Sequence, residues 1–260
     1  MSLVKTAEEI EFLRENNQLV SKTLAELAKH IKPGVTGLML DKIAEEFIRS
    51  HGAAPGFLGY EGYPNTLCTS INDVVVHGIP NTYELREGDI ISVDCGTIKH
   101  GFYGDSAFTF MVGEVAPEVK QLLKVTRESL ELGVAKAVEG NRIGDISHAV
   151  QSHVERFGYS VIREMQGHGL GKNMHEEPGV PNYGKPGQGK KLIKGMVICV
   201  EPMINLGKKD IYQERDGWTI RTNDRKPSAH FEYAVAVGKG KPDILTTFEY
   251  VDKALKTKKN

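Results

Sequence analysis

The chain has few cysteines, and their number and spacing argue against a disulfide-stabilised fold. Only Cys68, Cys95 and Cys199 occur among its 260 residues. Three is an odd number, and no two of them have the CxxC spacing of a redox or zinc motif. We therefore expect free thiols and a reducing compartment.

Long apolar runs and a strong net charge are also absent. No run approaches the ~20 apolar residues that span a bilayer, and the polar N-terminus MSLVKTAEEIEFLRENN resembles neither a signal peptide nor a transit peptide. The formal net charge is −1, which suggests no sequence-specific nucleic-acid partner and no membrane partner. Together these absences predict a cytoplasmic protein.

The rest of the composition is that of an ordinary globular domain, with 40% apolar and 26% charged residues. A chain of this length can bury a substantial core. We expect one domain over residues 1–250, followed by a basic and flexible tail over residues 251–260.

Apolar residues at helical spacing predict two pairs of helices. The first pair covers residues 6–31 and 36–51, and a capping box places the first helix start at Thr6. The second pair begins at Pro117 and at about Ile143. Segments rich in glycine and β-branched residues follow each pair, so we expect strands there.

The order of helix, helix and strands therefore occurs twice, which indicates an internal repeat of residues 6–113 and 117–238. Glycines flank the second helix of each pair at a constant offset of 106 residues: Gly34 and Gly52 in the first half, Gly140 and Gly158 in the second. The strand GDIISVD (88–94) likewise resembles GMVICVE (195–201) at an offset of 107. Asp94 and Glu201 thus occupy equivalent positions, each at the end of an apolar strand.

These acids need a partner if they are buried. One carboxylate at the end of an apolar run is most simply a surface group, but a buried one must be protonated, paired or bound to a cation. Asp105 and Glu232 lie in similar settings. Four acids and one histidine would suit Mn, Fe, Co or Zn. They exceed the needs of one tetrahedral zinc, so two bridged metals ~3.5–4 Å apart are expected.

The histidine is expected in GHGLGKNMHEEP (167–178). The zinc motif HExxH fails there, because Gly179 stands where its second histidine would be and Pro178 would break the required helix. Walker A spacing is also missing. The remaining interpretation is a turn in which glycines let the backbone approach a site while a histidine projects into it.

Across most of its length, roughly from Thr6 to Gly238, the chain resembles the type I methionine aminopeptidases, which have the pita-bread fold. The segments that carry the resemblance are GYPNTLCTSINDVVVHGIP (62–80), GDIISVDCGTIKHGFYGDSAFTF (88–110), GHGLGKNMHEEPGVPNYG (167–184), GMVICVEPMIN (195–205) and DGWTIRTNDRKPSAHFEYAVAV (216–237). The resemblance implies an α/β (α+β) fold of two pseudo-twofold-related halves, each with two helices packed on a curved, mainly antiparallel sheet.

The resemblance also implies a metal centre of two divalent ions, Co, Mn, Fe or Zn, without naming which. By analogy, Asp94 chelates one ion, His168 and Glu201 hold the other, and Asp105 and Glu232 bridge them. The bridging water or hydroxide would be the nucleophile. Glu201 would also accept and donate the proton.

Two further histidines match catalytic positions of the family that do not bind metal. His77 alone would be an ordinary loop residue, but in the context VHGIP it matches a residue that contacts the substrate amide. His175 matches one that helps to stabilise the tetrahedral intermediate. His230 lies two residues from Glu232, so we expect both on one face of a strand, with His230 in a neutral supporting role.

The methionine pocket implied by the family is apolar and partly aromatic. Its matching positions are Phe57, Tyr60, Tyr63, Cys68, Met174 and Trp218. Phe57 stands where a smaller Cys is common and Met174 where Phe is common, a swap of bulk that could preserve the pocket volume. Asn72, Val74 and Ser228 match positions around a monovalent cation, Na⁺ or K⁺.

The expected activity is removal of the N-terminal methionine from nascent proteins and peptides whose second residue is small. The short spacing between His168, Glu201 and Glu232 leaves no room for the helical insertion of type II enzymes. Expected partners are peptide and nascent-protein N-termini and the ribosome, and the family favours a monomer. Two alternatives stay open: another pita-bread hydrolase, such as an Xaa-Pro aminopeptidase, or a non-catalytic binding protein on this fold.

Overall fold

Amphipathic segments form the four helices that their spacing predicts. The computed structural model describes residues 3–258. Its helices include α1 (Ala7–His30), α2 (Gly37–Ser50), α3 (Pro117–Val134) and α4 (Ile143–Glu155). The predicted capping box is present, because the Thr6 hydroxyl accepts the Glu9 N–H and the Glu9 carboxylate accepts the Thr6 N–H. None of the helices in residues 3–258 is long and apolar enough to cross a membrane.

The named strands pair antiparallel and form four sheets within the described residues. The main sheet of the first half contains β1 (Ala54–Pro55), β2 (Leu67–Ile71), β4 (Ile90–Lys99) and β5 (Phe102–Met111). The main sheet of the second half has the order β15 (Asp243–Ile244), β14 (Tyr233–Ala236), β9 (Val197–Val200), β7 (Gln166–Gly169), β8 (Glu176–Pro181).

Two small sheets complete the strand layer. One has the order β13 (Ser228–His230), β10 (Met203–Asn205), β6 (Ser160–Val161). The other has the order β11 (Ile211–Gln213), β12 (Ile220–Thr222), β3 (Val74–Val76), and it joins a strand of the first half to two strands of the second. A short 3₁₀ helix, η1 (Tyr60–Gly62), lies between β1 and β2.

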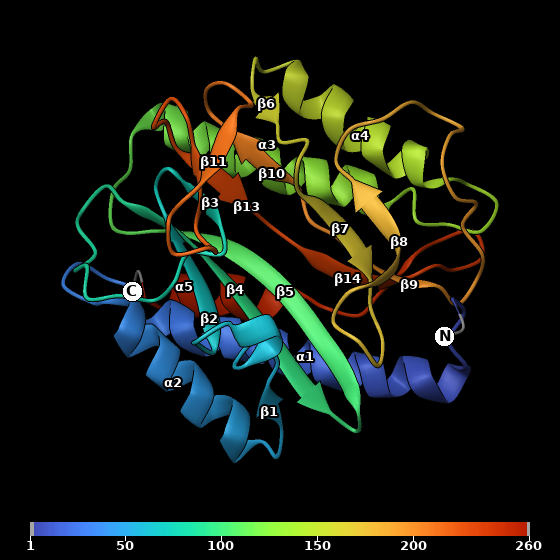
Figure 1. Cartoon of the computed structure of the whole chain (residues 1–260), viewed down its shortest axis with the longest axis horizontal. Coiled ribbons are helices and arrows are strands. Elements are labelled where there is room, and N and C mark those ends of the chain that lie inside the picture. Colours follow the sequence, from blue (N-terminus) through green and yellow to red (C-terminus); the bar gives the residue numbers. More distant parts are fainter. Residues whose placement is uncertain (1–2, 259–260) are drawn as a thin grey trace.

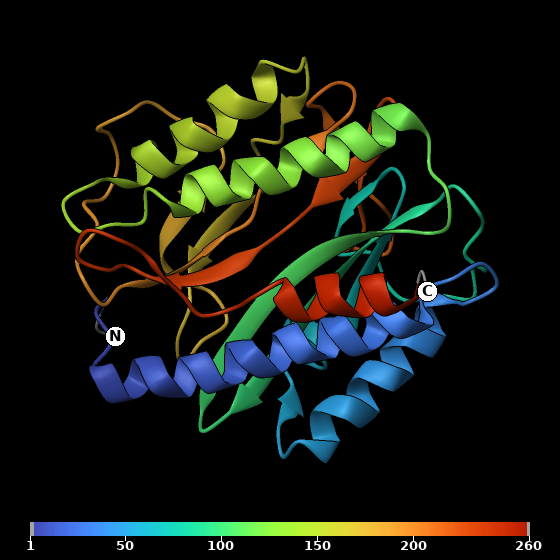
Figure 2. The same ribbon diagram turned by 180° about the vertical axis from the view of Figure 1, so that it is seen from behind.

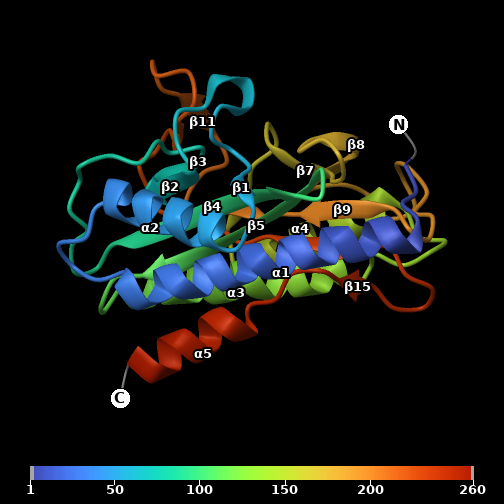
Figure 3. The same ribbon diagram turned by 90° about the horizontal axis from the view of Figure 1, so that it is seen from below.

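The helices lie on one side of the strands. Seen from behind, α1 and α2 form one pair and α3 and α4 the other, with α5 (Glu249–Lys258) between the pairs (Figure 2). The side view places α1, α3 and α5 below the strands and β11 with its loops above them (Figure 3). None of the α-helices in residues 3–258 covers the other face of the two main sheets, which is turned to the viewer in Figure 1.

A continuous apolar core holds the two halves together. Buried side chains from all four main helices and from β4, β5, β9 and β14 belong to one cluster. Its largest fully buried members include Phe110 and Phe248. The halves repeat at the expected offsets, since α2 and α4 start at Gly37 and Ile143, and β4 and β9 start at Ile90 and Val197.

The C-terminal segment differs from the expected flexible tail. Residues Glu249–Lys258 form α5, and Val251 is fully buried against α1. Asp252 accepts two hydrogen bonds from Arg127 at 2.8 and 2.7 Å. The expected flexible tail is therefore wrong for these residues, because Val251, Ala254 and Leu255 are at helical spacing and give the basic segment one face that packs on the core. Residues 259–260 lie outside the described part of the chain.

Two expected strand positions also differ. Asp94 was expected at a strand end, but β4 continues to Lys99 because its second part pairs with both β1 and β5. Asp105 lies inside β5, which already begins at Phe102. Both acids are thus held by regular sheet structure on either side.

Candidate metal centre

The two aspartates come from adjacent strands and point to the same face. In the β4–β5 register, Asp94 lies opposite Ala107 and Asp105 lies opposite Gly96. The aspartates are therefore diagonal neighbours across the pair. The backbone N–H of Asp105 donates to Oδ1 of Asn17 at 3.0 Å, which fixes this point of β5 to α1.

The two glutamates come from the second half and face the aspartates. Val200 of β9 pairs with Tyr233 of β14. Glu201 directly follows Val200 and Glu232 directly precedes Tyr233, so the two glutamates lie side by side at the same end of this strand pair. The Glu232 N–H donates to the Ala107 carbonyl at 2.9 Å, and the Ser106 hydroxyl donates to the Glu232 carbonyl at 2.7 Å. These bonds join the halves where the four acids meet.

His168 projects from a strand and not from the expected turn. It lies in β7, which pairs with β9 on one side and with β8 on the other. A Cβ on Gly167 would lie 2.2 Å from the Cys199 carbonyl oxygen, and one on Gly169 would lie 2.3 Å from the Glu177 carbonyl oxygen. The glycines do allow close backbone approach, as predicted, but the close neighbours are strands of the same sheet.

Burial makes the charged form of these acids unfavourable. Asp105 is only 4% exposed and Glu232 only 2%. Oδ1 of Asp94, Oδ1 of Asp105 and Oε1 of Glu232 are buried without a hydrogen-bond partner. Burial raises the pKa of Asp94 to about 6, and burial and then the neighbouring carboxylates raise the pKa values of Asp105, Glu201 and Glu232.

The histidine shows what would compensate this charge. Nδ1 of His168 lies 2.9 Å from the Gly169 carbonyl oxygen and can only donate to it, so the proton of the neutral ring is on Nδ1. Burial lowers the pKa of His168 to about 4, so the ring is neutral. The Nε2 lone pair then faces Asp105 Oδ2 and Glu201 Oε1, both at 3.6 Å. A lone pair facing two carboxylates is repulsive unless a proton or a cation lies among them, and imidazole with several carboxylates is a donor set that fits a divalent metal.

Cys199 is a further member of the cluster that the sequence did not single out. Four residues each place one potential metal-ligand atom within 4.8 Å of the others: Asp105, His168, Cys199 and Glu232. Burial and the nearby acids, Glu232 first among them, raise the pKa of the thiol. Strand alternation could have found it, because Cys199 lies two residues before Glu201 on the same face.

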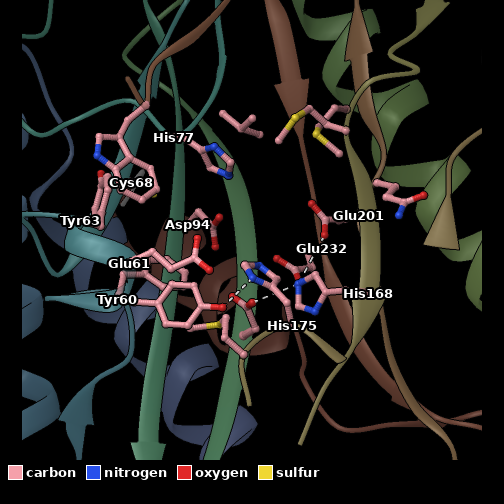
Figure 4. A pocket seen from close by; sticks show the side chains of 18 residues that line it. Tyr60, Glu61, Tyr63, Cys68, His77, Asp94, His168, His175, Glu201 and Glu232 are labelled. Atoms are coloured by element: carbon pink, nitrogen blue, oxygen red, sulfur yellow. Dashed lines mark hydrogen bonds and ion pairs between the residues drawn. The ribbon is translucent and has the colours of Figure 1, made fainter. Parts of the chain in front are cut away.

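The metal-site residues line the floor of a cavity of about 220 Å³ (Figure 4). All thirteen residues predicted for the metal centre, the catalytic histidines and the methionine pocket line it: Phe57, Tyr60, Tyr63, Cys68, His77, Asp94, Asp105, His168, Met174, His175, Glu201, Trp218 and Glu232. The sequence missed five other lining residues: Glu61, Val76, Met165, Gln166 and Met203. Strand alternation could have suggested two of them, because Gln166 lies two residues from His168 and Met203 lies two residues from Glu201.

His77 and His175 lie above the floor from opposite sides (Figure 4). His77 has a left-handed backbone with φ of 57°, and the following Gly78 is pressed onto β2, where a Cβ would lie 2.4 Å from the Thr69 carbonyl oxygen. Nδ1 of His175 is 3.0 Å from the Tyr60 hydroxyl. Burial lowers the pKa of His77 to about 4 and also lowers the pKa of His175.

One wall of the cavity is apolar and aromatic. The rings of Tyr63 and Trp218 meet edge to face with centroids 5.1 Å apart. Phe57 and Met174 cover Gly96, where a Cβ would lie 2.5 Å from the Phe57 ring and 3.1 Å from the Met174 methyl group. Phe57 and Met174 therefore lie side by side on one surface of the cavity. A larger side chain at one position and a smaller one at the other could compensate in volume only if the two are neighbours.

The residues predicted for a monovalent cation lie apart from this cavity. The Ser228 N–H donates to the Asn72 carbonyl at 2.9 Å, and Asn72 has a positive φ of 53°. Asn72 and Val74 line a second, polar cavity of about 460 Å³. Asn72 and Ser228 are thus neighbours, with Val74 two residues from Asn72.

Comparison with known proteins agrees with this geometry. Residues 11–239 match metallopeptidase family M24. The chain belongs to this family. A methionine aminopeptidase from Clostridium acetobutylicum is 50% identical to this M24 member over 250 residues, which is 96% of this chain and 100% of that relative.

Two solved structures show the same architecture as this chain. The crystal structure of methionine aminopeptidase from Rickettsia prowazekii has a TM-score of 0.92 at 41% identity and covers 94% of this chain and 99% of that one. An X-Pro aminopeptidase from Thermotoga maritima has a TM-score of 0.74 at 22% identity, covering 94% of this chain and 62% of that one, and shares the fold alone. The predicted pita-bread fold and the predicted metallopeptidase class are confirmed.

Proposed function

We propose that this metallopeptidase is a methionine aminopeptidase, which hydrolyses the bond after an N-terminal methionine when the second residue is small. One observation carries the proposal. The neutral His168, two buried acids and two half-buried acids line a cavity whose wall is apolar and aromatic. The methionine aminopeptidases among its relatives, at up to 50% identity over nearly the whole chain, support the choice of substrate.

The proposed cofactors are two divalent ions, Co, Mn, Fe or Zn. Asp94, Asp105, His168, Glu201 and Glu232 would hold them, because their donor atoms converge without protein partners that satisfy them. When bound, such ions lower the pKa of water and polarise a carbonyl group.

The chain's own residues supply proton transfer and orientation. We assign to Glu201 the acceptance of a proton from the attacking water and its delivery to the leaving amine, since it lies on the cavity floor beside His168. With the Tyr60 hydroxyl donating to Nδ1 of His175, the neutral ring carries its proton on Nε2 and can donate to the substrate carbonyl oxygen. His77, also neutral, lies opposite and would contact the scissile amide.

The wall of the cavity suits an uncharged thioether side chain. Burial raises the pKa values of the Tyr63 hydroxyl and the Cys68 thiol, so both remain neutral. Phe57, Met174 and Trp218 add apolar surface. A charged first residue would lose its hydration against this apolar wall.

The proposal is tested with a peptide panel on the metal-loaded protein. Release of methionine from Met-Ala-Ser, with little release from Met-Leu-Ser or Lys-Ala-Ser, is expected. Release of Xaa from Xaa-Pro peptides without cleavage of Met-Ala-Ser would instead assign an Xaa-Pro aminopeptidase. Peptide binding without any hydrolysis, with metal present in full equivalents, would assign a non-catalytic binding protein.

We further propose a single catalytic domain, residues 1–250 extended by the packed helix α5, that acts as a monomer on peptides and on nascent chains at the ribosome. Ribosome binding is tested by co-sedimentation of the wild-type chain with ribosomes at physiological salt. We also propose that carbonyl groups near Asn72, Val74 and Ser228 bind Na⁺ or K⁺. Thermal melting in KCl and in choline chloride at equal ionic strength should then differ.

A further inference from the structure

His230 is a buried histidine that the proposed mechanism does not use. It ends β13, is 1% exposed, and lies opposite Met203 in the register of β10 and β13. Its backbone is held from both sides by Thr109, whose Oγ1 accepts the His230 N–H at 2.9 Å and donates to the His230 carbonyl at 2.7 Å. The Thr109 hydroxyl also lies 2.8 Å from Ser92 Oγ. These bonds fix the position of the His230 backbone.

The ring of His230 faces Glu201. Its Nε2 lies 3.4 Å from Oε2 of Glu201, while Nε2 of His168 lies 3.6 Å from the other oxygen, Oε1. The Glu201 carboxylate therefore lies between two imidazoles. His168 lines the cavity with Glu201, whereas His230 is not among the side chains that line it.

The two imidazoles differ in the surroundings of Nδ1. In His168, Nδ1 donates to the Gly169 carbonyl, which leaves Nε2 as a lone pair for a metal. A histidine that binds metal through one nitrogen almost always donates the other N–H to an acceptor. Within residues 3–258, neither ring nitrogen of His230 forms a hydrogen bond, and the carboxylate oxygen that faces Nε2 is Oε2 of Glu201, at 3.4 Å. The proton is therefore best placed on Nε2, directed at Glu201.

We propose that His230 is a positioning residue that holds Glu201 through Nε2–H and Oε2, so that Oε1 is presented on the side of His168. The inference rests on the proposed function and adds a positioning residue to its five proposed metal ligands. Glu201 has two tasks, to hold a divalent ion and to carry a proton, and both require one fixed carboxylate orientation. A donor that does not line the cavity fixes that orientation without occupying the cavity.

The test compares His230→Leu with His230→Gln. Leucine removes the donor at similar bulk, and glutamine restores an N–H at similar reach. His148→Leu, at an exposed histidine on α4, is the matched control. Each protein is stripped of metal and titrated with Mn²⁺ or Co²⁺. Bound equivalents, affinity and the Co²⁺ visible spectrum are measured, followed by kcat and KM for Met-Ala-Ser and melting of the metal-free form.

His230→Leu should bind the same number of metal equivalents, with about 10- to 100-fold loss in kcat or in affinity for one equivalent, little change in KM, and an altered Co²⁺ spectrum. His230→Gln should recover most of the loss. Three results overturn the proposal. A missing metal equivalent in His230→Leu would make His230 a ligand, unchanged affinity and kcat would leave it no role, and no recovery in His230→Gln would rule out the donor.

Failure of the proposed function can be told apart from failure of this inference. A wild-type protein that binds two metal equivalents but does not cleave Met-Ala-Ser would refute the proposed activity. The affinity and the Co²⁺ spectrum of the variants would still report whether His230 holds Glu201, since neither readout needs turnover.

Discussion

His168 and His175 are seven residues apart in the chain, and their ring centroids are 4.4 Å apart, yet their surroundings suit them to different tasks. His168 has a fixed Nδ1–H and an Nε2 that faces carboxylates. His175 has Nδ1 against the Tyr60 hydroxyl and is more exposed, at the rim of the cavity. The first arrangement suits a metal ligand and the second suits a donor to substrate.

This difference predicts distinct defects for two alanine variants. His168→Ala should lose one metal equivalent and nearly all activity. His175→Ala should keep its metals and lose kcat by about 10²- to 10³-fold, because only a hydrogen bond in the transition state is removed. Elemental analysis and steady-state kinetics on Met-Ala-Ser check both. Loss of a metal equivalent in His175→Ala would contradict the assignment.

At this scale the sequence could place the acids and the two histidines, because each stands in a distinctive local pattern. It could not show that Cys199 contacts Glu232 or that His230 faces Glu201. Cys199 looks like an ordinary apolar strand residue, and the direction of the His230 ring depends on strand pairing across β10 and β13. Such contacts depend on the tertiary arrangement of several strands.

At the scale of elements, helices were predicted more accurately than strands. Thr6 and Thr36 cap α1 and α2, as their local sequence indicates. The glycine segment around His168 was expected to be a turn, since glycine is rare in strands. It is a strand because only glycine allows β7 to lie so close to β8 and β9. That closeness is a property of the sheet and leaves no local pattern.

The structure of α5 leads to a prediction about stability. A chain that ends at Phe248 lacks the buried Val251 and the Asp252 partner of Arg127. The free energy of unfolding should fall by at least about 2 kcal/mol, the value of one buried aliphatic side chain. A chain that ends at Lys258 is the control and should melt like the full chain. Urea unfolding measures both; equal stability of the two truncated chains would show that α5 does not support the core.

At the scale of the whole molecule, the site exists only where the halves meet. Asp94 and Asp105 come from the first sheet, and His168, Glu201 and Glu232 come from the second. The repeat in the sequence predicted this partition, because Asp94 and Glu201 fall at equivalent positions. Bringing the acids together has an electrostatic cost, since burial raises their pKa values in the absence of metal.

That cost predicts an unusual pH dependence for the metal-free protein. Burial raises the pKa of Asp94 from its ordinary value of 3.8 to about 6. Below the ordinary value the carboxyl group is protonated in both the folded and the unfolded chain. As the pH rises through 4 to 6, the unfolded chain loses this proton more readily than the folded one, so Asp94 destabilises the fold increasingly and its effect levels off above about 6.

Asp94→Asn isolates this effect, because the amide cannot ionise. In EDTA, the melting temperature of Asp94→Asn relative to wild type should rise as the pH increases from 4 to 6, because the variant lacks both the buried carboxylate and its repulsion of the neighbouring acids. With Mn²⁺ or Co²⁺ at pH 7 the order should reverse, because metal binds the folded wild-type site and stabilises it by mass action. A difference that stays flat with pH in EDTA would show that the Asp94 carboxylate is not strained by burial. A difference that does not reverse with metal would show that Asp94 is not a ligand.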